Sequence, residues 1–228
     1  MLRHLACIMD GNRRWAKKRL LRPWLGHKEG VHTIQRVIDF CFKHTITYLS
    51  LYTFSIENLQ RPEQEKNYIF SALIAQAEKQ LDGFIKQGIR VRFIGDRSLF
   101  PSDVLVVCER IEQKTAHLSS LCVQFFFCYS GRQEIIAGIK KLVGQMRNEE
   151  NSDAITEELF KQYLWSGDLP EPDLIIRTGG AQRLSNFLLY QAAYSELYFL
   201  DCLWPDLSVD DLQKAVTYFN TCKRNFGS

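Results

Sequence analysis

Apolar residues in this 228-residue chain follow two kinds of pattern, which alternate along the sequence. Short, nearly continuous apolar runs are typical of buried strands, and apolar positions three and four residues apart indicate helices with one apolar face. The runs predict six strands, at residues 4–9, 46–54, 89–94, 121–128, 174–177 and 196–200. Helical patterns occur within residues 31–42, 70–85, 104–111, 135–146 and 208–219. This alternation predicts an α/β fold in which helices flank a six-stranded, mainly parallel sheet.

The length and composition fit a single domain that extends over residues 1–228. With 46% hydrophobic residues, the chain can build a sizeable core. It has no uncharged apolar stretch of about 18 residues, so no membrane-spanning helix is expected. Seven cysteines without C-x-x-C spacing indicate reduced thiols. Because no secretion signal is visible either, we expect a cytoplasmic location.

Polar residues follow three of the predicted strands. Asp10 follows the first strand, Ser55 and Asn58 follow the second, and Arg177 ends the fifth. The carboxyl ends of parallel strands lie at one edge of the sheet, and ligands bind beyond that edge. We therefore expect these residues to contribute to one site.

The amino-terminal segment concentrates positive charge around one carboxylate. Residues 1–28 contain eight Lys and Arg but only one acid, Asp10, although the whole chain carries a net charge of only +3. A Gly-Asn turn before a cationic helix start suits a polyphosphate, because free backbone N–H groups and Arg side chains bind phosphate oxygens. Asp10 could form a salt bridge or hold Mg²⁺ on that phosphate. A solvated helix face or a nucleic-acid patch is the alternative for such a basic run.

A second candidate anion site lies near the carboxyl end of the chain. Arg177 and Arg183 flank a Gly-Gly turn, and the hydroxyl of Ser185 follows them. Two phosphate-type sites on one edge predict two phosphorylated substrates. A structural ion pair between Arg177 and Glu196 is the alternative role for that arginine.

Five segments resemble, in the same order along the chain, the motifs of cis-prenyltransferases, the undecaprenyl diphosphate synthase family: MDGNRRWAKK, GHKEG, YTFSIENLQRP, RTGGAQRLSNFLLYQAAYSELYF and WPDL. The resemblance implies Mg²⁺-dependent addition of isopentenyl diphosphate units to an allylic diphosphate, usually farnesyl diphosphate. It implies a homodimer, an apolar tunnel for the growing chain, and a product that serves as the undecaprenyl lipid carrier for cell-wall synthesis. A membrane-associated product also suggests a peripheral position at the membrane, and no nucleic-acid partner is expected.

The resemblance also assigns roles to individual residues. Asp10 and Asn58 match catalytic positions, and Asp10 and Glu196 match Mg²⁺ contacts, with Glu196 lent across the dimer. The substrate-binding positions are Gly11, Asn12, Arg13, Arg14, Trp15, Arg22, His27, Ser55, Ile56, Glu57, Leu59, Arg61, Arg177, Arg183, Leu184 and Ser185. Ile89 and Leu121 match the tunnel floor. The acceptor of the proton lost from isopentenyl diphosphate is left open between Asn58, diphosphate and water.

The chain departs from the family pattern at four places. Ala181 stands where the family usually has Glu, and Leu59 stands where it usually has Trp. Pro23 stands where an Arg is expected, with Arg22 one position earlier, and residues 225–227 replace an Arg-x-Gly feature. These departures bear on the turnover rate and on whether the chain needs a partner subunit. The alternative function is a non-catalytic partner subunit of a heteromeric prenyltransferase, but Asp10 and the two-Arg block favour a catalytic chain. An RNA-binding protein would need more aromatic residues beside its cations than Trp15 and Trp24.

Overall fold

The computed structural model describes residues 1–145 and 155–223. One sheet contains β1 (His4–Ile8), β2 (Tyr48–Ser55), β3 (Ile89–Ile94), β4 (Leu121–Tyr129), β5 (Leu174–Arg177) and β6 (Glu196–Phe199), in the order β3-β4-β2-β1-β5-β6. Each neighbouring pair of strands is parallel. The predicted α/β fold with a six-stranded sheet is confirmed, and the strand ends lie within two residues of their predicted positions.

The helices of the described residues are α1 (Asn12–Lys18), α2 (Leu25–Lys43), α3 (Glu63–Gln87), α4 (Ser102–Thr115), α5 (Gly131–Gln145), α6 (Glu157–Tyr163) and α7 (Val209–Thr221). The apolar patterns predicted the five longest of them, and residue 146 of one pattern lies outside the described residues. The pattern did not predict α6, which has only seven residues. In the described part of the chain, no helix has the length and apolar character needed to cross a bilayer.

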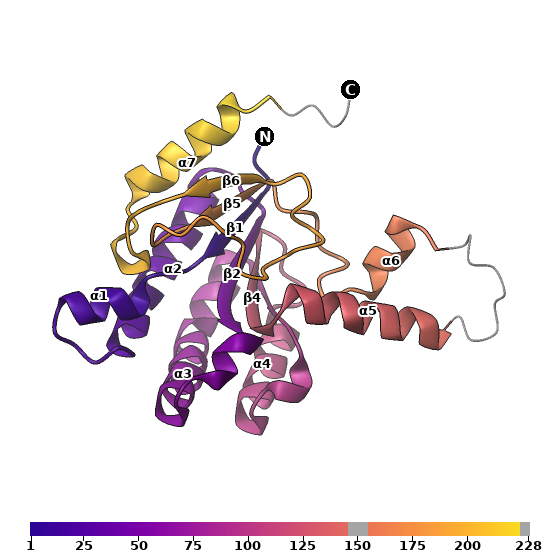
Figure 1. Cartoon of the computed structure of the whole chain (residues 1–228), viewed down its shortest axis with the longest axis horizontal. Coiled ribbons are helices and arrows are strands. Elements are labelled where there is room, and N and C mark those ends of the chain that lie inside the picture. The colour runs from indigo at the N-terminus through magenta and orange to yellow at the C-terminus, as the bar shows by residue number, and fades with distance from the viewer. Residues whose placement is uncertain (146–154, 224–228) are drawn as a thin grey trace.

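Both faces of the sheet are buried, which explains why the strands have continuous apolar runs. Leu5 and Ala6 of β1 point to opposite faces and belong to different core clusters. The larger cluster lies between the sheet and α2, α3, α4 and α7 (Figure 1). The smaller cluster packs instead under irregular chain between α6 and β6, which contributes Leu169, Phe187 and Leu188. Helices therefore cover one face, and mainly loops cover the other.

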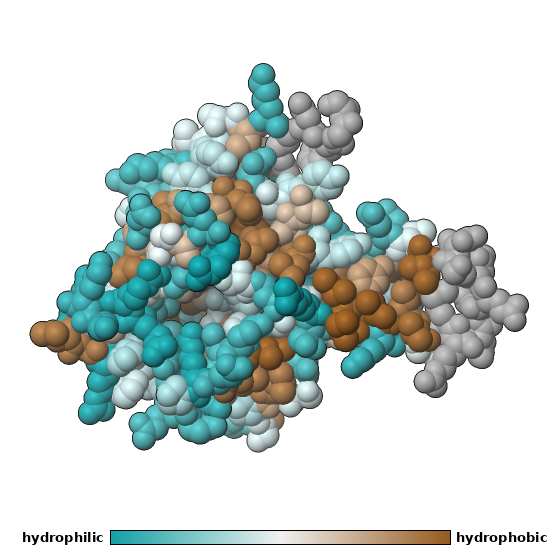
Figure 2. All heavy atoms as spheres, viewed as in Figure 1, coloured by the Kyte–Doolittle hydropathy of each residue, from teal (hydrophilic) through white to brown (hydrophobic). Residues whose placement is uncertain are grey.

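Helix α5 buries Leu142 but leaves most of the apolar face that its pattern predicted exposed. Ile136, Ile139 and Val143 are 46%, 43% and 59% exposed, whereas Glu134 and Gly138 are buried. Gly138 lets Phe160 and Leu164 of the α6 region pack closely against α5. The α5–α6 pair extends to the side of the sheet in Figure 1, and apolar side chains cover this region in Figure 2.

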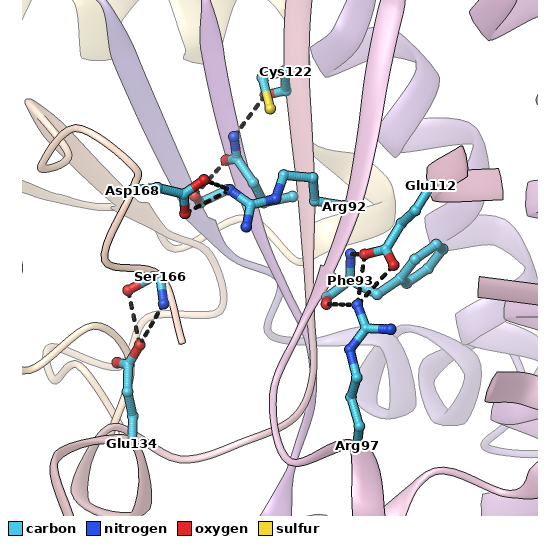
Figure 3. Close-up of polar contacts among 10 residues, drawn as sticks. Arg92, Phe93, Arg97, Glu112, Cys122, Glu134, Ser166 and Asp168 are labelled. Atoms are coloured by element: carbon cyan, nitrogen blue, oxygen red, sulfur yellow. Dashed lines mark hydrogen bonds and ion pairs between the residues drawn. The ribbon is translucent and has the colours of Figure 1, made fainter. Parts of the chain in front are cut away.

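Buried polar contacts fix the loops around α5. Glu134 accepts hydrogen bonds from the Tyr129 hydroxyl at 2.5 Å, from the Ser166 N–H and hydroxyl at 3.0 and 2.8 Å, and from the Gln191 amide at 2.9 Å. Figure 3 shows the Glu134–Ser166 contact, together with the ion pairs Arg92–Asp168 and Arg97–Glu112. A buried carboxylate with four donors is well satisfied, so it stabilises the loops without requiring a ligand.

We predict that Gly26→Ala disrupts the packing of α1 on α2. An added Cβ would lie 2.6 Å from the backbone carbon of Asn12, and overpacking of this kind typically costs about 1–3 kcal/mol. Gly144→Ala in α5 is the matched control, because nothing lies within 4 Å of its Cβ position. That variant should be neutral or up to about 1 kcal/mol more stable. Urea unfolding measures both; equal effects would contradict the close packing of the two helices.

Candidate functional site

Three loops meet at the carboxyl edge of the sheet, because β2, β1 and β5 are neighbours. A cavity of about 380 Å³ opens between them. Its polar lining comes from all three loops and from the neighbouring parts of α1, α2 and β5: Asp10, Asn12, His27, Ser55, Asn58, Arg61, Arg177, Arg183 and Ser185. An adjoining outer cavity of about 650 Å³ adds Gly11, Arg13 and Arg14. The prediction that distant polar clusters gather on one edge is thus confirmed.

Asp10 joins α1 to the end of β5. One carboxylate oxygen accepts a hydrogen bond from Arg14 Nη2 at 3.1 Å, and the other accepts one from Arg177 Nη2 at 3.0 Å. Its backbone carbonyl accepts a hydrogen bond from the Thr178 hydroxyl at 2.7 Å. We call the side chains of Arg14, Asp10 and Arg177 the Asp10 clamp. The alternative ion pair between Arg177 and Glu196 is wrong, since Arg177 pairs with Asp10.

Gly179 makes room for this clamp. It has φ of +86°, and an added Cβ would lie 3.2 Å from Cγ of Asp10 and collide with Nη2 of Arg14. A residue other than glycine would therefore be strained in its backbone and would displace the Arg14 side chain.

Arg177 also holds the loop that follows it. Its Nη1 donates to the Ser185 hydroxyl at 2.7 Å and to the backbone oxygen of Arg183. Arg177 is only 4% exposed, and its Nε has no hydrogen-bond partner. Ser185 and Asn186 have positive φ angles of 50° and 65°, a conformation that other surrounding contacts must stabilise.

Asn186 supplies such contacts, and the sequence did not identify it as a site residue. Its Nδ2 donates to Glu57 at 2.7 Å and to the Ser130 hydroxyl at 2.6 Å. It therefore links the loop after β5 to the loop after β2. Its position next to Ser185 in the motif was the available signal.

Glu65 is a second unpredicted member of the site. It is 4% exposed, and its Oε1 lies 3.2 Å from Arg61 Nη1 and 3.5 Å from Arg13 Nε. The cationic loop thus meets two carboxylates, Asp10 and Glu65. Nothing in the sequence indicated that the first turn of α3 would reach the amino-terminal loop.

His27 is neutral at pH 7 in this environment. Burial lowers its pKa to about 4, and the nearby positive charges of Arg61 and Arg13 act in the same direction. Its Nε2 and the Oδ1 of Asn12 are buried without hydrogen-bond partners. Because buried polar groups normally find partners, these atoms and Arg177 Nε are candidates for contacts with a ligand.

Other predicted residues lie at different places around the cavity. Asn58 lines it, and its Oδ1 accepts the Ser55 N–H at 3.3 Å. The Trp15 indole instead donates to Asp206 at 2.7 Å, outside the cavity lining. Arg22 is exposed and lies over the Trp24 ring at 5.6 Å.

The apolar predicted residues lie in or against the core. Leu59 packs against the larger core cluster and Leu184 against the smaller one. Ile56 is half-buried at the start of the 3-10 turn Ile56–Gln60. Ile89 and Leu121 are fully buried partners at the amino ends of β3 and β4, and neither lines the polar cavity.

Glu196 and Asp10 lie at opposite edges of the sheet. Glu196 is level with Leu174, which is level with Leu5, whereas Asp10 lies beyond the other end of β1. One chain therefore does not bring the two expected metal contacts together, and a shared metal would need Glu196 from a second copy.

The residues present suit a metal ion that binds together with phosphate. Within the described residues, no group of three or more His, Cys, Asp or Glu could form a metal site. Mg²⁺ commonly binds through one or two carboxylates and completes its octahedron with phosphate oxygens and water. Asp10, on the cavity wall beside Arg14 and Arg177, fits that single-carboxylate arrangement.

Apolar residues also line the cavity. Three of them, Ile69, Ala72 and Leu73, come from α3. A smaller cavity of about 40 Å³ shares Val31, Ile34 and Leu73 with it and reaches Phe84 and Phe125. The residues shared by the two cavities come from α2 and α3.

We predict that His27 makes folding stability depend on pH. The pKa of His27 is about 4 in the folded chain and near 6.5 when exposed, so only the unfolded chain binds this proton between those values. The unfolding free energy should fall as pH drops from about 6.5 to about 4, by up to about 1.4 kcal/mol per pH unit for one histidine. His4, whose pKa burial also lowers to about 4, adds to the wild-type slope.

His27→Gln should reduce this slope, measured by urea unfolding at several pH values. His117→Gln is the control, because His117 is exposed. Unchanged slopes in both variants would contradict the buried, neutral state of His27.

Several known proteins are similar to this chain over nearly its whole length. The model of the prenyltransferase family described as "Putative undecaprenyl diphosphate synthase" matches residues 8–227. An isoprenyl transferase of Clostridium perfringens is 42% identical and covers 100% of this chain and 90% of its own length. A ditrans,polycis-undecaprenyl-diphosphate synthase of Buchnera aphidicola, named as (2E,6E)-farnesyl-diphosphate specific, is 43% identical over 99% of this chain and 91% of its own length.

Two solved structures are also similar. Lavandulyl diphosphate synthase from Lavandula x intermedia, in complex with dimethylallyl diphosphate, has a TM-score of 0.96 at 29% identity and covers 100% of this chain and 98% of its own. A "probable undecaprenyl diphosphate synthase" from Campylobacter jejuni has a TM-score of 0.83 at 37% identity, with 100% and 99% covered. The chain belongs to the prenyltransferase family of the undecaprenyl diphosphate synthases.

Proposed function

We propose that this prenyltransferase is Mg²⁺-dependent and condenses isopentenyl diphosphate units onto an allylic diphosphate. The observation that carries the proposal is the Asp10 clamp, which joins an arginine of each predicted anion site through one carboxylate. The allylic diphosphate binds at the amino-terminal loop beside Arg13, Arg14 and neutral His27. Isopentenyl diphosphate binds at the loop of Arg177, Arg183 and Ser185.

These side chains suit a reaction in which diphosphate leaves. The allylic C–O bond breaks only if the negative charge that develops on the leaving group is stabilised, and preorganised arginines do this in a site that excludes water. Mg²⁺ held by Asp10 would supply further positive charge to the phosphate oxygens. The amide of Asn58 lines the same cavity and can orient a substrate or water, while its Oδ1 is engaged with Ser55.

The relatives support farnesyl diphosphate as the primer and an undecaprenyl product. The Buchnera relative is named for both, and the lavender structure contains an allylic diphosphate. We infer that the product is the polyprenyl carrier used in cell-wall synthesis, made in the cytoplasm and delivered to the membrane. The proposed tunnel runs between α2 and α3, with Ile89 and Leu121 at its floor.

A homodimer is the proposed assembly. The exposed apolar stripe of Ile136, Ile139 and Val143 on α5 offers a surface that a second copy would cover. Within one chain, Glu196 lies at the opposite edge of the sheet from Asp10. A dimer would allow Glu196 to reach the metal site at Asp10 of the other copy. The alternative, a non-catalytic partner subunit, has no specific observation in its favour, because both arginine loops and Asp10 are in place.

We predict that Asp10→Ala lowers turnover by roughly 10³-fold, since loss of one charge-stabilising contact in a transition state costs about 3–4 kcal/mol. The assay follows incorporation of radiolabelled isopentenyl diphosphate into farnesyl diphosphate with Mg²⁺, and chromatography reads the product length. Asp168→Ala is the control, because Asp168 pairs with Arg92 outside the cavity lining. Near-normal turnover of Asp10→Ala would refute the assigned role, and an inactive wild-type chain would favour the partner-subunit alternative.

We predict that Leu121 limits product length. Leu121 and Phe125 share one face of β4, and Phe125 lines the smaller cavity, so Leu121 lies farther along the proposed tunnel. Leu121→Ala should shift products to longer chains and Leu121→Trp to shorter ones, because a chain stops where insertion would force overpacking. Cys122→Ala is the control, since the next residue of a strand faces the other side. An unchanged product distribution in both Leu121 variants would place the floor elsewhere.

A further inference from the structure

The segment after α1 exposes two leucines to solvent. Leu20 is 97% exposed and Leu21 is 42% exposed. Every residue from 17 to 22 is exposed, and we call this segment the basic tip: Lys17, Lys18, Arg19, Leu20, Leu21 and Arg22. In Figure 1 the loop after α1 reaches the left margin of the molecule. An apolar patch surrounded by hydrophilic side chains lies at the same place in Figure 2.

The tip has an ordered backbone that presents Leu20 outward. The N–H of Leu20 donates to the carbonyl of Lys17 at 3.1 Å, and the N–H of Leu21 donates to that of Ala16 at 2.9 Å. Leu20 has φ of +57°, in the left-handed region that glycine or asparagine usually occupies. A leucine there accepts an unfavourable backbone conformation yet buries almost no side chain within the chain. The two hydrogen bonds and this φ angle form a Schellman cap that ends α1, which accounts for the backbone conformation. Core packing does not account for the choice of leucine at this position.

The charges around the leucines identify the complementary surface. The tip contains four cations, and the chain has no acidic residue between Asp10 and Glu29. Arg19 is partly neutralised by Asp206 at 3.3 Å, whereas Lys17 and Lys18 have no ion pair within the described residues. Exposed apolar side chains flanked by Lys and Arg suit the interface of an anionic bilayer. Two copies of the tip would repel each other because both are positively charged. A nucleic-acid base would need to stack on the Trp15 ring, but Arg19 already covers that ring.

The tip lies at the entrance to the functional site. Lys17 and Leu21 line the outer cavity together with Asp10, Arg14 and His27. A lipid surface in contact with the tip would therefore lie beside the cavity mouth. We propose that the basic tip is a membrane-docking element, which inserts Leu20 and Leu21 into an anionic lipid surface and holds the cavity mouth against it.

Vesicle co-sedimentation of the full chain tests this proposal without substrate, so its outcome is independent of the proposed catalytic function. Vesicles of phosphatidylcholine with phosphatidylglycerol should bind the wild type, and pure phosphatidylcholine should bind it much less. Leu20→Asn should weaken partitioning on the order of tenfold, because a buried leucine side chain typically contributes that much. Asparagine tolerates the left-handed backbone, so the fold should persist, which circular dichroism checks.

Val106→Asn is the matched control, because Val106 is 65% exposed on α4, away from the tip. It should leave vesicle binding unchanged. Lys17→Gln combined with Lys18→Gln should weaken binding to anionic vesicles and reduce its salt dependence. Equal binding of wild type and Leu20→Asn would overturn the proposal. Self-association that Leu20→Asn abolishes, without any vesicle binding, would overturn it in favour of a contact between copies.

Discussion

The site depends on one charge interaction, the bridge that the Asp10 carboxylate makes between Arg14 and Arg177. Without a carboxylate there, the guanidinium groups of Arg14 in α1 and Arg177 at the end of β5 would face each other in a partly buried space, and like charges at short range repel strongly. Asp10 allows them to converge, and Gly179 provides the space in which they do so. The same arrangement presents positive charge toward the cavity, so the interaction that stabilises the loops also prepares an anion site.

The parallel sheet makes this convergence possible. Neighbouring strands β2, β1 and β5 end at the same edge, so their loops need no long excursions to meet. The Glu134 network fixes the irregular chain that covers the second face, and Asn186 connects the loop after β5 to Glu57. Rigid elements thus hold the arginines, while several buried polar atoms, including Asn12 Oδ1 and Arg177 Nε, remain without partners. Because Asn12 and Arg177 line the cavity, these buried atoms are positioned to contact a ligand.

The sequence predicted most of the fold because buried parallel strands and amphipathic helices leave distinct apolar periods. It also placed Asp10 and Arg177 on one edge, because both follow strands of a parallel sheet. It could not predict that Glu65 would pair with Arg13 and Arg61, since this contact depends on how α3 docks beside the amino-terminal loop. The exposed face of α5 was also mispredicted, because an apolar stripe does not reveal whether it is covered by the same chain. Glu196 matches a metal position in motif, but the register of β6 sets it at the opposite edge.

We propose that diphosphate and Mg²⁺ bind together at the Asp10 clamp. Isothermal titration calorimetry with inorganic pyrophosphate, with and without Mg²⁺, tests it on the wild type and on Asp10→Asn. Mg²⁺ should tighten pyrophosphate binding to the wild type and have little effect on Asp10→Asn, which keeps the arginines but loses the carboxylate charge. The same Mg²⁺-dependent gain in affinity in both proteins would contradict it.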